Sequence, residues 1–354
     1  MKKEARKYYL DILKVISIFC VMYVHTGNDG MHIYETTEGL SHYVSFFLRE
    51  YAHTCSYMFF MITGALLLKK EEDLKTVLLK RVLKYGVIIL LAETARLIYY
   101  NVASGTKLSF KGWFSAIYST NVLEQYWFLH AYLAFLIMLP FLRMIAKGLS
   151  KQTALYLLVL LTIFEFGCSY FEILMDLSRI SISVPLLTDI IILPLLGYCA
   201  EYVLSDWLEK FSVRVVVYVA AILAFAADLL YTHKMYLAGN IIPEMNGSYF
   251  IMTIGLYVLG RKLFMNVGKK HRLDEKKVRI LSSATLCVLL LEPELREFTH
   301  IVYEISAPYL GWLVAVLLWL AAAYFMAVVI NLLYRIFTEA ILKTIGQKKK
   351  HEKA

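Results

Sequence analysis

Long apolar runs alternate with short polar segments along almost the whole chain. A helix that spans a bilayer needs roughly 20 mainly apolar residues, and windows of that kind recur about every 30 residues. They lie near residues 9–27, 52–68, 84–101, 125–143, 153–171, 185–204, 213–231, 247–265, 280–296 and 308–334. The pattern predicts an all-α integral membrane protein, a bundle of about ten transmembrane helices. This polytopic domain is expected to cover residues 1–340, with a basic cytoplasmic tail over 341–354.

The composition agrees with a membrane protein and argues against two soluble domains. Of the 354 residues, 59% are hydrophobic and only 18% are charged, and the mean hydropathy is +0.59. The net charge of +9 does not indicate nucleic-acid binding, because the basic residues are spread over several short loops with no binding fold around them. The five cysteines lie in apolar windows without CxxC spacing, as expected of packing thiols, so we predict no metal site.

The distribution of lysine and arginine predicts the orientation, because positively charged segments resist translocation. With the N-terminus in the cytoplasm, most of the 37 basic residues fall in cytoplasmic segments and few fall in the opposite loops. An even number of helices then returns the C-terminus to the cytoplasm. The longest outer segments, 28–51 and 102–124, mix aromatic and polar residues, and we expect interfacial helices or lids there.

The first predicted helix carries ionisable residues along one face. At 100° per residue, Lys14 and Asp11 lie within about 20° and 40° of His25 around the axis, and Asp11 is about 20 Å from His25 along it. Ionisable groups inside hydrocarbon are costly and mark functional sites. Histidine titrates near neutrality, so we expect His25 to act as a general base at the outer end. Alternatively, His25 bonds only a backbone carbonyl, and Asp11 and Lys14 form an intrahelical pair.

Further polar residues fall in the outer halves of other predicted helices and suggest a substrate pocket there. They are Glu93 and Arg96 in the third helix, Trp127 and His130 in the fourth, Asp228 in the seventh, and Glu292, Glu294 and Arg296 in the ninth. Each also has a structural interpretation. Trp127 can serve as an aromatic anchor at the membrane interface, and His130 can make structural hydrogen bonds. Glu93 with Arg96, and Glu292 with Arg296, can simply neutralise each other.

The predicted cytoplasmic segment 69–84 concentrates positive charge, including Arg81 and Lys84, at the entry to the third helix. Such a cluster suits the phosphates of a cytosolic ligand. It equally suits a positive-inside loop that binds anionic lipid.

Several of these segments resemble the membrane-bound family-3 acyltransferases. YYLDILKVISIFCVMYVHTG resembles their opening helix, which reads D-x-x-R, an apolar run and a histidine near the helix end. YMFFMITGALLLKKEEDLKTVLLKRVLK resembles their FFFxSG helix and the basic segment after it, with Thr63 in place of serine. QYWFLHAYLAFLIMLPFL is similar to their WFL-x-A helix, and SSATLCVLLLEP is similar to a late helix that usually ends in His-Pro.

The chain departs from the family pattern at three places. Lys14 replaces an arginine, and Arg81-x-x-Lys84 replaces Arg-x-x-Arg. Both changes keep the charge but lose a planar, bidentate donor, because lysine is a point charge. Glu292 stands at the position of the late histidine, so a role that needs imidazole there does not carry over directly.

The resemblance implies transfer of an acyl group, usually acetyl from cytosolic acetyl-CoA, to a hydroxyl of a cell-envelope glycan or lipid-linked sugar outside a bacterial plasma membrane. It implies a catalytic set of His25, Asp11 and Glu292, and donor binding by Lys14, Arg81 and Lys84. It leaves Trp127, His130, Arg96 and Arg296 as candidates for acceptor binding. Membrane lipids are the other expected partners, and the oligomeric state is not predicted.

The main alternative is a secondary transporter of a polar or anionic solute. Intramembrane acids, histidines and arginines also line ion and substrate pathways. Transporters often have paired helices broken by glycine or proline in two symmetric halves, and the sequence shows no such symmetry. A membrane anchor without chemistry does not explain the polar face of the first helix.

Overall fold

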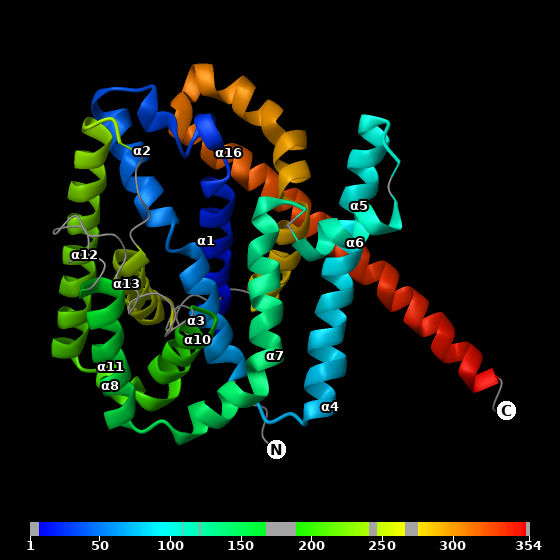
Figure 1. Cartoon of the computed structure of the whole chain (residues 1–354), viewed down its shortest axis with the longest axis horizontal. Coiled ribbons are helices and arrows are strands. Elements are labelled where there is room, and N and C mark those ends of the chain that lie inside the picture. The colour runs from blue at the N-terminus through cyan, green and yellow to red at the C-terminus, as the bar shows by residue number, and fades with distance from the viewer. Residues whose placement is uncertain are drawn as a thin grey trace. The chain divides into compact units, whose positions relative to one another are not determined.

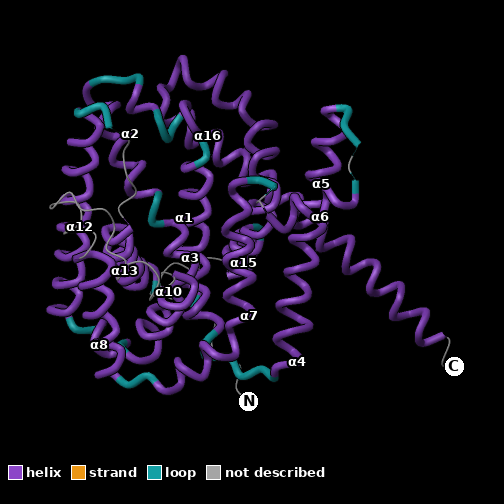
Figure 2. Tube along the Cα trace, viewed as in Figure 1, coloured by secondary structure: helices purple, strands orange, loops and turns teal. Residues whose placement is uncertain are grey.

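The structure is a computed structural model that describes residues 7–107, 109–119, 122–167, 189–240, 246–265 and 275–351. Within these ranges the chain is helix and loop with no strand, as Figure 2 shows. The helices, labelled in Figure 1 except for α15, which Figure 2 labels, are α1 (Tyr8–Val24), α2 (Gly39–Ala52), α3 (Cys55–Leu67), α4 (Leu74–Val77), α5 (Lys84–Ser104), α6 (Phe110–Ser119), α7 (Trp127–Gly148), α8 (Lys151–Leu161), α10 (Asp189–Tyr198), α11 (Ser205–Leu208), α12 (Phe211–Leu237), α13 (Asn246–Phe264), α15 (Glu275–Ser283) and α16 (Thr285–His351). Short 3-10 turns cover Gly27–Asp29, Ile33–Glu35 and Glu124–Tyr126, and π-helical turns cover Leu78–Leu83, Thr162–Gly167 and Cys199–Val203.

The predicted helical class is confirmed for the described residues, and every predicted apolar window contains a helix. Three helices are long and apolar enough to cross a bilayer, namely α7, α12 and α16 over Thr285–Glu339. The count of ten spans and the orientation of the termini stay predictions. Inside α16, Gly311 has φ 76° and ψ 162°, a conformation that favours glycine and breaks the helix. The break lies near the start of the last predicted window, so α16 accounts for two windows.

The predicted helices in the outer segments 28–51 and 102–124 are also present, as α2 and α6. Helix α6 exposes Phe110, Phe114 and Tyr118. Its indole Trp113 donates a hydrogen bond to Thr94 Oγ1 of α5 at 3.0 Å. An exposed aromatic surface on a short helix is typical of the membrane–water interface.

The chain divides into two compact units, Met1–Arg49 with Leu263–Ala354, and Glu50–Lys262. In the first unit α1 packs against α15 and α16, although these helices are far apart in sequence (Figure 1). Tyr324 of α16 helps to join them, because its ring lies 4.9 Å from the Phe19 ring and its hydroxyl donates to Leu281 O at 2.9 Å. The polar first helix therefore packs against the two helices that follow Leu263 in the first unit.

In the second unit α3 and α10 cross closely at two glycines. A Cβ atom at Gly64 would overlap the carbonyl of Pro194, and one at Gly197 would overlap the carbonyl of Met61. Small residues let helix backbones approach in this way. The glycine of the FFFxSG-like segment is therefore required by packing.

We expect Gly64→Ala to destabilise the protein by about 1–3 kcal/mol, because the added methyl group forces two backbones apart. Thermal unfolding in detergent measures the loss. Gly86→Ala is the matched control, since a Cβ there meets only Leu133 at an ordinary 3.9 Å. Equal melting temperatures for the two variants would contradict the packing argument.

Candidate active site

His25 lies directly after α1, at the start of a tight turn. The Thr26 hydroxyl donates to Tyr23 O at 2.6 Å and accepts from the amide of Met31 at 2.9 Å. The Tyr23 hydroxyl donates to Gly30 O at 3.1 Å. These bonds close the turn and fix the backbone that carries the imidazole.

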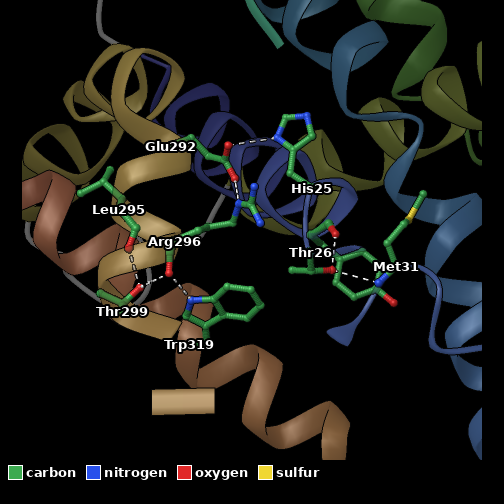
Figure 3. Close-up of polar contacts among 9 residues, drawn as sticks. His25, Thr26, Met31, Glu292, Leu295, Arg296, Thr299 and Trp319 are labelled. Carbon is green, nitrogen blue, oxygen red and sulfur yellow. Dashed lines mark hydrogen bonds and ion pairs between the residues drawn. The ribbon is translucent and has the colours of Figure 1, made fainter. Parts of the chain in front are cut away.

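The carboxylate of Glu292 contacts both His25 and Arg296 (Figure 3). Its Oε2 lies 3.4 Å from His25 Nδ1, and its Oε1 accepts a hydrogen bond from Arg296 Nε. Glu292 is only 2% exposed, whereas His25 is half-buried. A carboxylate at Nδ1 favours the tautomer that carries its proton on that nitrogen, which leaves the lone pair on Nε2 to act as a base.

Arg296 compensates the buried negative charge of Glu292, as a buried carboxylate requires. Arg296 lies one helical turn after Glu292 on α16, so the predicted pairing is confirmed. Its carbonyl accepts a hydrogen bond from Trp319 Nε1 at 2.9 Å, and its guanidinium lies 6.0 Å from the Trp319 ring centre. Figure 3 shows the sequence of contacts from Trp319 through Arg296 and Glu292 to His25.

Asp11 and Lys14 occupy the other end of α1. Asp11 is buried and accepts a hydrogen bond from Ser282 Oγ of α15 at 2.8 Å. Lys14 is half-buried one turn later. Because Asp11 is about 20 Å from His25 along the helix axis, it lies outside the group formed by His25, Glu292 and Arg296.

The second unit contains another histidine–carboxylate pair. His130 Nε2 of α7 lies 3.2 Å from Oε1 of Glu93, a buried residue of α5. The guanidinium of Arg96 lies 5.9 Å from the Tyr100 ring centre. Trp127 begins α7, is exposed, and packs its edge against Phe128 at 5.8 Å. The Glu93–His130 contact joins two helices and is not predictable from spacing within one.

The predicted donor-binding segment forms a cluster of two arginines around one carboxylate. Arg81 lies in the π-helical turn and donates to both oxygens of Glu72, at 2.8 and 2.6 Å. Arg143 of α7 donates to Glu72 Oε2 at 2.9 Å and to Leu67 O at 3.1 Å. Lys84, the first residue of α5, is exposed. Sequence reasoning missed Glu72 and Arg143, which are separated by 71 positions.

The hydrogen bonds from Arg81, and secondarily from Arg143, lower the pKa of Glu72 from 4.5 to about 2. A folded-state pKa below the unfolded one stabilises the protein above pH 4.5, and this contribution is lost as the pH falls toward 2. The Glu72 side chain is 22% exposed. We therefore expect Glu72→Gln to cost about 1–3 kcal/mol at neutral pH.

Unfolding in detergent at neutral pH and at about pH 3 measures this effect, and the deficit of Glu72→Gln should shrink at the lower pH. Glu71→Gln is the control, because its pair with Lys147 is largely exposed and contributes little. A deficit that is the same at both pH values would show that the charge of Glu72 is not the cause.

Sequence reasoning also missed His300, a second histidine of the first unit that contacts carboxylates. His300 Nε2 lies 3.0 Å from Asp29 Oδ2, and His300 Nδ1 lies 3.2 Å from Glu304 Oε1. A signal was present in the sequence, because Glu292, Arg296, His300 and Glu304 recur every four residues and so share one face of α16. Within the described residues, no group of three or more His, Cys, Asp or Glu side chains has the arrangement of a metal site.

Comparison with known proteins agrees with the motifs. A family model described as an acyltransferase domain matches residues 7–336, which is nearly the whole chain. Searches of curated proteins and of solved structures gave no significant match. The family resemblance inferred from the motifs is thereby confirmed. The chain therefore belongs to acyltransferase family 3, as a membrane protein whose activity is acyl transfer.

Proposed function

We propose that the protein transfers an acyl group, acetyl in the simplest case, from cytosolic acyl-CoA to a hydroxyl of a cell-envelope glycan or lipid-linked sugar. The proposed protein crosses a bacterial plasma membrane several times, and the acceptor is acylated at the outer face of that membrane. The observation that carries the proposal is the contact between His25 and the buried carboxylate of Glu292, in a chain of this family.

His25 and Glu292 supply what acyl transfer to a hydroxyl requires. The Nε2 lone pair of His25 removes the proton of the acceptor hydroxyl while its oxygen attacks the thioester carbonyl. The carbon–sulfur bond then breaks, and the imidazolium returns the proton to the sulfur, which gives the ester and free CoA thiol. Glu292 stabilises the imidazolium between these steps, and Arg296 keeps the charge of Glu292 compensated.

Donor binding is assigned to Arg81 and Lys84, with Lys14 as a further positive group on α1. Arg81 and Arg143 are both bound by Glu72, so a planar donor of the segment 69–84 lies beside a planar donor of α7. Guanidinium groups suit the phosphates of CoA because they bind in a bidentate manner. Because Glu72 already accepts from Nε and Nη2 of Arg81, a phosphate would bind the remaining guanidinium N–H groups of Arg81 and Arg143 together with the exposed Lys84.

Acceptor binding is assigned to the polar residues of the predicted outer half. The exposed indole of Trp127 offers a flat apolar surface for a sugar ring, and His130 with Glu93 offers hydrogen-bonding groups. Arg96 remains a candidate because it also lies in the predicted outer half. Arg296 is less suited to bind substrate, because Glu292 already engages its guanidinium.

We expect Arg81→Glu combined with Lys84→Glu to weaken acetyl-CoA binding in detergent more than tenfold, because two attractions to phosphate become repulsions. Isothermal calorimetry measures the affinity. Lys111→Glu is a control on the short helix α6, away from this segment. Unchanged affinity in the double variant would indicate that the basic segment serves only lipid contact and orientation.

The direct test is mass spectrometry of envelope glycans from cells that contain or lack the protein. An added acetyl mass on one sugar in the presence of the protein would identify both the acyl group and the acceptor. Identical glycans and lipid-linked sugars would contradict the proposal. A change in uptake of a polar solute, with no change in acylation, would favour the transporter.

A further inference from the structure

Two histidine–carboxylate contacts connect the same two segments of the first unit. The histidine belongs to the N-terminal segment in one contact and to α16 in the other. In one, His25 of the N-terminal segment meets Glu292 of α16. In the other, Asp29 of the N-terminal segment meets His300 of α16. His300 follows Glu292 by two helical turns, and Asp29 follows His25 by one short turn. The segment that carries His25 is therefore attached to α16 at both ends.

The backbone between His25 and Asp29 is held in one conformation by local hydrogen bonds. Residues Gly27–Asp29 form a 3-10 turn, and the Asp29 amide donates to Thr26 O at 3.3 Å. A Cβ at Gly30 would overlap the Thr26 side chain and approach Val316 of α16 to 3.3 Å. A displacement of Asp29 is thus transmitted to the backbone of His25.

His300 is itself held in position by its surroundings on α16. Both ring nitrogens face carboxylate oxygens, Nε2 that of Asp29 and Nδ1 that of Glu304. Its ring lies 4.8 Å from the Trp319 ring in an edge-to-face arrangement. Trp319 also donates to the carbonyl of Arg296, so it contacts both Arg296 and His300 on this face of α16.

We propose that His300 is a positioning residue, which through Asp29 sets the distance and angle between His25 and Glu292. This inference rests on the proposed function of His25 as the general base. The Asp29 and His300 side chains are 40% and 32% exposed, and a pair so accessible to water adds little to stability. Its effect is on geometry, where an error of about 1 Å can cost a factor of about 100 in rate.

The kinetic test compares His300→Ala, Asp29→Ala and the double variant. Each single change should lower kcat about tenfold or more and leave the KM for acetyl-CoA within about twofold, and the double variant should be no worse than either. His300→Gln should recover part of the activity, because its amide still donates to Asp29. Losses that multiply in the double variant, or a loss confined to KM, would overturn the proposal.

The matched control is His32→Ala. His32 Nδ1 lies 3.2 Å from Glu35 Oε1, and their side chains are 42% and 51% exposed, so this pair resembles Asp29–His300 in contact and in access to water. Both of its members lie in the N-terminal segment, however, and it does not reach α16. His32→Ala should therefore keep the wild-type kcat, and a tenfold loss there would count against the specific role of His300.

A chemical footprint separates this inference from the proposed function. Diethyl pyrocarbonate modifies accessible imidazoles, and mass spectrometry of the peptide that contains His25 gives the rate. His300→Ala and Asp29→Ala should raise the rate at His25 several-fold, because His25 is released from Glu292, while His32→Ala should not. An unchanged rate would overturn the positioning role. Absence of acyl transfer by the wild-type protein would instead contradict the function, and the footprint would still decide the positioning role.

Discussion

His25→Ala is expected to abolish detectable acyl transfer while the protein reaches the membrane at its normal level. Loss of a general base typically lowers the rate by 10² to 10⁴. The imidazole lies at the end of α1, is partly open to solvent and pairs with Glu292, so the variant is expected to fold. Acetylated glycan per unit of protein, from quantitative mass spectrometry and immunoblotting, measures the effect.

His233→Ala provides the matched control for His25→Ala. His233 is a half-buried histidine of α12 that stacks on Tyr236, so its removal tests the loss of an imidazole to which the proposed mechanism assigns no role. It should retain wild-type acylation. Wild-type acylation by His25→Ala, at equal abundance, would remove His25 from the mechanism.

Glu292→Gln should give the second large loss, about 10² or more in rate, because it keeps the shape of the side chain and removes the charge that stabilises the His25 imidazolium. The same change leaves Arg296 without its carboxylate. Breaking a buried pair costs about 3–5 kcal/mol, and the partial exposure of Arg296 places the expected cost below this range. Activity and thermal stability must therefore be measured on the same preparation.

Glu292→His and Arg296→Ala separate the two roles of Glu292. Glu292→His restores the residue typical of the family at this position, and it should recover part of the activity lost in Glu292→Gln if the position handles protons. Arg296→Ala tests the structural pair. Normal activity in Glu292→Gln, together with strong destabilisation by Arg296→Ala, would show that Glu292 serves only to neutralise Arg296.

The fold class was predictable because each helix that crosses hydrocarbon must present apolar side chains over its whole length. The need for apolar side chains applies to each helix separately, so it can be recognised in any single stretch of about 20 residues. The close approach at Gly64 depends on the neighbouring helix, so the apolar pattern contains no sign of it. Whether each predicted window crosses the membrane depends on the bilayer as well as on the chain.

The candidate site was predictable in part, for a related reason. Counting residues along a span gives the depth of a side chain, and it placed His25 and Glu292 both toward the predicted outer ends of their helices, where the structure brings the two side chains into contact. Depth does not tell which helices are neighbours. The contacts of Asp11 with Ser282 and of Asp29 with His300 each connect residues 271 positions apart. Only the three-dimensional structure reveals them.

The π-helical turn Leu78–Leu83 fixes the rotation of the preceding residues around the helix axis, relative to α5, at a value that differs from that of a continuous α-helix. A π turn holds one residue more than the α-helical turn it replaces, so deletion of a single residue there would leave a continuous α-helix. It would also rotate everything before the deletion by about 100° relative to everything after it. Glu93 could then still face His130 only if Arg81 turned away from Arg143. Among related chains, insertions and deletions should therefore be excluded from this turn.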